Sequence, residues 1–206
     1  TKINTTGIEL GAFDLTVAVM YPKGIRLKQL FEDALDTFPL IKVLDENSKR
    51  YVLHTLALLA DISPKTASLP ESLKPKHINE LWEKAVVNIA EACEVVDEYC
   101  GAGLKNGNDK FLVYSPLISV LAYVINTIPI NVKNDKHLTL LRRDKLRAWY
   151  FGSGISNRYS EGTDAKQQKD KTEILKWFSS PNFEENIPAW LNLVYGEFNS
   201  SKSSAI

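Results

Sequence analysis

Apolar residues recur at intervals of three and four along most of the chain, the spacing of amphipathic helices, and convincing two-residue alternation is scarce. After a first short stretch over 10–20, the main helices are expected over 27–38, 51–60, 77–99, 111–128, 136–151, 163–178 and 182–193. The stretch 51–60 is apolar almost throughout, which places it at the centre of the core. The pattern predicts an all-α protein, an irregular bundle of about seven helices.

Prolines and glycines divide this pattern. Three proline-containing steps make residues 61–76 the clearest connector. The glycine pairs at 101–103 and 152–154 are expected to end the helices before them, because glycine favours helix C-termini. Residues 1–199 are therefore expected to form one helical domain. Residues 200–206 are expected to be a disordered polar tail.

Charge and hydropathy exclude several classes of protein. Lysine plus arginine equals aspartate plus glutamate, at 25 each, so no global field attracts nucleic acid or a membrane. No apolar run reaches the ~18 residues of a membrane helix, and no secretory signal opens the chain. Cys93 and Cys100 would lie roughly 10 Å apart along one helix, too far for a disulfide. Free thiols and a cytoplasmic location are expected.

Residues that could carry catalysis or bind a metal do not gather in the sequence. His54, His77 and His137 fall in different predicted elements, and no cysteine or histidine lies at metal-ligand spacing. The acidic run 91–98 fits a solvated helix face opposite an apolar stripe. The two Gly-x-Gly steps lack the strand and lysine of a phosphate-binding loop. We therefore expect no catalytic residue, metal or cofactor in this chain.

The strongest charged feature is a group of four cations on one predicted helix, just before Trp149 and Tyr150. Its members are Arg142, Arg143, Lys145 and Arg147. Such a patch beside aromatic rings suits a phosphate backbone. The alternative is a solvated helix face whose arginines pair with acidic residues of the bundle, and the zero net charge favours it.

Two further segments have polar residues just before predicted helices and are candidate contact sites. Arg158, Tyr159 and Ser160 follow the second glycine pair, and Ser160 or Thr163 could cap the next helix. The N-terminal turn Asn4-Thr5-Thr6-Gly7 has side chains able to bond backbone or ligand.

These two segments, in this order, resemble a large bacterial family, domain-of-unknown-function family two-six-two, typified by the GmrS half of GmrSD-type modification-dependent restriction systems. Residues 3–10 with Phe13-Asp14-Leu15 match its I-N-T-x-G signature. Residues 140–151 followed by Arg158-Tyr159-Ser160 match its later L-x-R-W…R-Y-s segment. The resemblance spans residues 3–178.

The resemblance implies a helical region that follows a ParB/sulfiredoxin-like domain carrying a D-G-Q-Q-R nucleotide-hydrolysis motif. This chain contains neither that motif nor an HNH nuclease arrangement, so catalytic chemistry is not carried over. The candidate contacts are Asn4, Thr5, Thr6 and Gly7 toward the missing N-terminal domain or its nucleotide, and Arg142, Arg143, Arg147, Arg158 and Tyr159 toward DNA.

Three functions remain open from the sequence. The region could be a scaffold of a bacterial defence protein that contacts DNA or a partner through its arginines. It could be a purely structural interdomain module, which predicts that Arg158 is buried and bonded within the bundle. It could also complete a nucleotide-hydrolysing site whose catalytic motif lies outside this chain.

Overall fold

The computed structural model describes residues 11–44, 47–107, 112 and 114–203, and this part of the chain is helical without strands. The class predicted from the sequence, all-α, is confirmed. The helices are α1 (Ala12–Met20), α2 (Leu27–Thr37), α3 (Pro39–Lys42), α4 (Asn47–Leu59), α5 (Leu69–Ser72), α6 (Pro75–Cys100), α7 (Pro116–Ile125), α8 (Lys136–Ile155), α9 (Thr163–Ser179) and α10 (Ala189–Ser203). Short 3₁₀ turns cover η1 (Tyr21–Lys23), η2 (Thr66–Ser68) and η3 (Leu104–Asn106).

The described residues thus form ten α-helices rather than about seven. Two of the additional ones, α3 and α5, are single turns of four residues, and α5 lies within the predicted connector 61–76. Each carries a proline, Pro39 or Pro70, in its first two positions. A proline there loses no backbone hydrogen bond and has its φ angle preset for a helix. Pro39, which was expected to end the preceding helix, therefore starts the next one.

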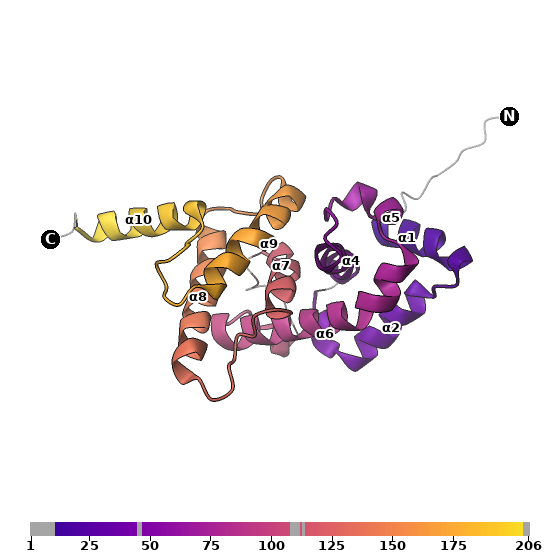
Figure 1. Ribbon diagram of the computed structural model, residues 1–206, viewed down its shortest axis with the longest axis horizontal. Coiled ribbons are helices and arrows are strands. Elements are labelled where there is room, and N and C mark those ends of the chain that lie inside the picture. Colours follow the sequence, from indigo (N-terminus) through magenta and orange to yellow (C-terminus); the bar gives the residue numbers. More distant parts are fainter. Residues whose placement is uncertain (1–10, 45–46, 108–111, 113, 204–206) are drawn as a thin grey trace.

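The core forms where α4, α6 and α7 pack against one another. Every residue of α4 from Tyr51 to Leu58 is buried, as predicted for that apolar stretch, and α7 is buried over most of its length. Figure 1 shows α1, α2 and α5 at one end of the molecule and α8, α9 and α10 at the other, with α6 passing between them. The long helix α6 therefore contributes to both ends.

The prediction that Gly152 and Gly154 end a helix was wrong, because α8 continues through both to Ile155. Gly152 is buried, and a Cβ atom there would collide with the Cδ1 atom of Leu191 in α10. The absence of a side chain lets α10 approach the backbone of α8. Close helix packing, and not helix termination, accounts for this glycine.

The last helix also differs from its predicted range. Residues 182–188 are not helical, and α10 begins at Ala189, directly after Pro188. A residue before a proline avoids the helical region, which delays the start. At its other end α10 reaches Ser203, past residue 199, where a disordered tail was expected to begin.

Candidate functional site

The two motif residues Arg158 and Tyr159 meet a single carboxylate, that of Asp170 in α9. The Arg158 Nη2 and Nε atoms donate to the two oxygens of Asp170, at 2.6 and 3.1 Å. The Tyr159 hydroxyl donates to Asp170 Oδ2 at 2.6 Å. We call these three residues the Asp170 cluster. Its two-point guanidinium contact fixes the turn between α8 and α9 against α9.

The Asp170 cluster lies inside the bundle. The Asp170 side chain is fully buried, and that of Arg158 is 12% exposed. Burial and the neighbouring Asp170 raise the pKa of Tyr159 well above its ordinary value. Burial opposes the charge of Arg158, but the Asp170 carboxylate more than compensates and raises the pKa of the guanidinium. The arrangement is a neutralised internal ion pair.

An aromatic ring covers the other side of the guanidinium. The Arg158 Cζ atom lies 4.7 Å from the ring centre of Trp190 in α10. A cation over an indole face is attracted by the ring electrons. Arg158 therefore connects three helical segments, the end of α8, the middle of α9 and the start of α10.

The capping roles predicted for Ser160 and Thr163 were wrong. The N-cap of α9 is Gly162, with φ of 58°, and no side chain caps the helix. The Ser160 hydroxyl instead donates to the carbonyl of Asn157 at 2.8 Å. The Thr163 hydroxyl donates to the carbonyl of Tyr159 at 2.9 Å. Both stabilise the turn that carries the Asp170 cluster.

The three arginines predicted to contact DNA bind parts of the bundle itself. Arg142 Nη1 donates to the Pro129 carbonyl at 2.7 Å, in the connection between α7 and α8. Arg143 donates to Asn131 Oδ1 at 2.8 and 3.2 Å. Arg147 Nε donates to the Tyr99 carbonyl, in the last turn of α6, at 3.0 Å. These side chains satisfy carbonyl and amide oxygens that a loop and a helix end leave without helical partners.

Two of these arginines have no ion-pair partner among the described residues. Arg147 lies 3.2 Å from the carboxylate of Asp144, whereas Arg142 and Arg143 form no ion pair with any described residue. Arg143 also lies 4.1 Å from the ring centre of Tyr99. Both residues are half-buried, and the Nε atom of Arg142 is buried without a hydrogen-bond partner. A positive patch therefore remains at this corner of the molecule.

Lys145 does not belong to that patch, although the sequence grouped it there. Its side chain is fully buried, and Nζ donates to the carbonyls of Trp177 and Ser180 at 2.7 and 2.8 Å. Burial and the nearby charge of Arg142 lower its pKa to about 8. The amine satisfies carbonyl groups at the C-terminus of α9, where a cation is favoured by the helix dipole.

Sequence reasoning missed a polar network around His54. The histidine is buried in α4, with Nδ1 2.8 Å from Gln167 Oε1 and Nε2 3.1 Å from Thr66 Oγ1. Gln167 Nε2 donates to the carbonyl of Pro116, so its Oε1 is the atom that accepts from His54. The proton is thus assigned to Nδ1, and Thr66 donates to Nε2. Asp164 accepts the backbone N–H of Thr66 at 3.0 Å.

This network predicts a pH dependence that can be assigned to one residue. Burial lowers the pKa of His54 from 6.5 to about 4. At pH values between these two pKa values, His54 is protonated in the unfolded chain and neutral in the folded protein. Acidification over this range therefore favours unfolding. Relative to a His54→Gln variant, wild type is expected to lose about 1–3 kcal/mol of unfolding free energy between pH ~7 and ~4. Urea unfolding at several pH values measures this. A constant difference between the two proteins would contradict the assignment.

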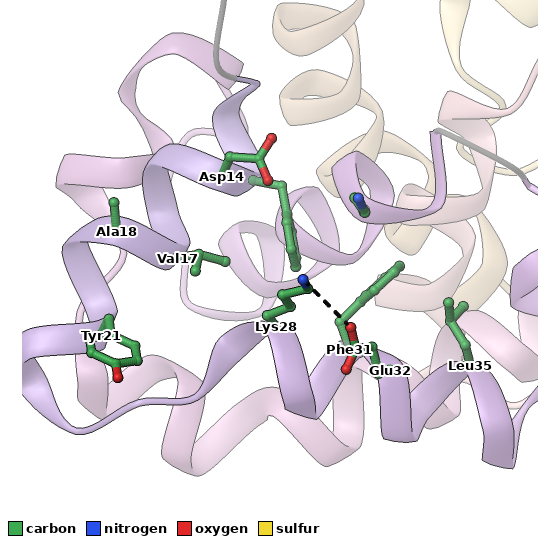
Figure 2. A pocket seen from close by; sticks show the side chains of 10 residues that line it. Asp14, Val17, Ala18, Tyr21, Lys28, Phe31, Glu32 and Leu35 are labelled. Carbon is green, nitrogen blue, oxygen red and sulfur yellow. Dashed lines mark ion pairs between the residues drawn. The ribbon is translucent and has the colours of Figure 1, made fainter. Parts of the chain in front are cut away.

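Three clefts open on the side of the molecule around α4. The first, of about 670 Å³, lies between α1 and α2 (Figure 2). The rings of Phe13 and Phe31, whose centroids are 5.1 Å apart, line it. The second, of about 480 Å³, is lined by residues of α1, α4 and α5. The third, of about 640 Å³, is lined mostly by residues with polar side chains and lies between Lys65 and the first turn of α9. None contains the Asp170 cluster.

The remaining candidates add no reactive centre. Asn4, Thr5, Thr6 and Gly7 lie outside the described residues. Cys93 and Cys100 are free thiols whose pKa burial raises to about 12. Within the described ranges, no three histidine, cysteine or acidic side chains come together as metal ligands, and no helix has the length and apolar character to cross a membrane.

Comparison with known proteins gives one informative match. The chain is 29% identical over 215 residues to a protein of Methanocaldococcus jannaschii named "Uncharacterized protein MJ0686". The alignment covers 98% of the chain, which spans about a third (34%) of the length of that relative. No protein-family profile and no solved structure matches the chain.

Proposed function

We propose that this chain is a helical support within a longer protein, to which it contributes rigidity and contact surface but no catalytic group. The observation that carries this proposal is the Asp170 cluster. Its arginine and tyrosine were candidates for contact with DNA, yet both bond to a buried carboxylate inside the bundle. That is the arrangement expected of the structural alternative.

We further propose that the longer protein resembles a GmrSD-type restriction protein. The I-N-T-x-G and R-Y-s motifs resemble GmrSD-type restriction proteins, in which this region would follow a nucleotide-hydrolysing domain. The relative from Methanocaldococcus jannaschii is about three times as long as the chain that matches it, which is consistent with additional domains. Nucleotide hydrolysis, DNA cleavage and a role in bacterial defence would belong to those additional parts.

A second candidate function, contact with the phosphate backbone of DNA, is supported by one observation. Arg142 and Arg143 are half-buried, and among the described residues they form no ion pair and donate hydrogen bonds to neutral oxygens. A phosphate could share these guanidiniums with the loop carbonyls they already bind. The patch is small, and the net charge of the chain is zero.

Binding to labelled duplex DNA across a salt series distinguishes the two candidates. The support role predicts no salt-sensitive binding, even at low ionic strength. Phosphate contact by Arg142 and Arg143 predicts an affinity that falls steeply with salt, with a slope reduced by about 1.8 in an Arg142→Gln/Arg143→Gln variant. Lys105→Gln, which removes an exposed cation elsewhere, is the control. The purely structural role would be overturned if the affinity for DNA fell steeply with salt, and if this binding were lost in the double variant but kept in the control.

A further inference from the structure

The exposed residues in the second half of α8 and the turn before it lie on one face of the helix. From position 140 to position 155 they are Leu140, Asp144, Arg147, Phe151 and Ile155, here called the α8 stripe. They follow one another at steps of three or four residues, the spacing of a single line along a helix. Figure 1 shows α8 at the end of the bundle opposite α1 and α2. The α8 stripe is therefore a continuous outer surface.

The α8 stripe is apolar at its two ends and charged in the middle. Leu140, Phe151 and Ile155 are 46%, 49% and 57% exposed, and they are three of the seven large hydrophobic residues exposed among those described. Between them, Asp144 and Arg147 form an ion pair at 3.2 Å, with side chains 60% and 47% exposed. Large apolar side chains that gather on one exposed face with polar neighbours mark a contact surface.

The order of residues in the α8 stripe is complementary to itself. Leu140 and Phe151 are equally far from the point midway between Asp144 and Arg147. When two such helices lie antiparallel about a twofold axis at that point, Leu140 of each copy faces Phe151 of the other. Asp144 of each copy likewise faces Arg147 of the other. In a parallel pair with the same register, like charges would face each other, so the charges select the antiparallel orientation.

The other cations of α8 are compatible with this orientation. Lys136, exposed in the first turn, would lie beside the C-terminal end of the other copy's α8, where the helix dipole favours a positive charge. Arg143, half-buried at the margin of the α8 stripe, is bound to Asn131 Oδ1 at 2.8 Å and lies against the ring of Tyr99. It therefore stays at the edge of the contact.

We propose that the α8 stripe binds a second copy of this chain, through an antiparallel and twofold-symmetric pair of α8 helices. One helix face per copy gives a small interface, on the order of 1,000 Å² in total, which is typical of reversible association. The expected dissociation constant of the dimer is about 10–100 μM. Self-association goes beyond the support role proposed above and does not depend on it.

Sedimentation equilibrium of the chain over a concentration series tests this proposal with two opposite charge variants. Asp144→Arg makes the centre of the α8 stripe wholly positive, and Arg147→Asp makes it wholly negative. Each variant alone is expected to raise the dissociation constant of the dimer at least about tenfold, because like charges then face each other at both symmetric positions. An equimolar mixture of the two is expected to restore the dimer, since every facing pair is again of opposite charge.

The apolar contacts provide a second arm that does not depend on the charge variants. Phe151→Glu is expected to raise the dissociation constant at least about tenfold, because the charge would be placed against Leu140 of the other copy. Val87→Glu, at an apolar residue 41% exposed on α6, is the control for this change. Glu32→Lys, in an exposed ion pair on α2, is the control for charge reversal. Both controls should dimerise as the wild type does, and circular dichroism verifies the folding of each variant.

Three results would overturn this proposal. The first is a wild-type chain that stays monomeric throughout the concentration series. The second is a dimer that Phe151→Glu and the charge variants do not weaken, which would place the contact on another face. The third is a mixture of the two charge variants that stays monomeric. None of these results bears on the support role, which the DNA-binding series tests separately.

Discussion

Replacing Asp170 with asparagine is expected to lower the free energy of unfolding by about 3–5 kcal/mol. The substitution preserves the shape of the side chain but removes the charge. The Arg158 guanidinium would then remain 12% exposed without its carboxylate, and the Tyr159 hydroxyl would lose an ionised acceptor. Removing one partner of a buried pair leaves the other charge uncompensated, and this cost exceeds the net contribution of the pair.

Chemical denaturation measures this effect, and the same helix offers a matched control. Lys169 pairs with Glu173 at 3.5 Å, and its side chain is 64% exposed. Lys169→Ala is expected to change stability by no more than about 0.5 kcal/mol. If Asp170→Asn costs no more than this control, the Asp170 cluster does not hold the bundle together.

Removing the Trp177 side chain is expected to destabilise the protein to a similar extent. Trp177→Ala should cost about 3–5 kcal/mol, because it leaves a large cavity in a close-packed core. The indole is fully buried and lies between the rings of Phe178 and Phe183, at centroid distances of 5.6 and 5.3 Å. Its Nε1 donates to the Phe183 carbonyl at 2.7 Å, an acceptor that the substitution leaves without its partner.

Thermal and urea unfolding of Trp177→Ala can be compared with those of Phe151→Ala. Phe151 is also aromatic but 49% exposed, so its loss is expected to cost less than about 1 kcal/mol. Equal costs for the two variants would show that the C-terminal helices are not packed around Trp177 as described.

The features that could be predicted from the sequence depend on neighbours in the chain. The apolar run at 51–60 and the stripe on 77–99 specify helices with a buried face, and α4 and α6 have those faces. The start of α7 at Pro116 is also a local feature, since proline suits the first turn of a helix.

The features that were missed depend on contacts between distant segments. Leu191, whose side chain lies where a Cβ atom of residue 152 would be, is 39 residues further along the chain. Gln167, the partner of His54, is 113 residues away. Lys145 stands among exposed cations in the sequence, and only the position of the α9 C-terminus shows that it is buried. No pattern of spacing within one helix carries this information.

The helix α6 contains 26 residues and so extends over about 39 Å, and it packs against α3, α4, α7 and α8. Neither end of the molecule can complete its own core without it. Local opening of one end alone would therefore expose apolar surface on the shared helix. The amide hydrogens at the centre of α6 are expected to exchange with solvent only when the whole chain unfolds, so the two ends behave as one cooperative unit.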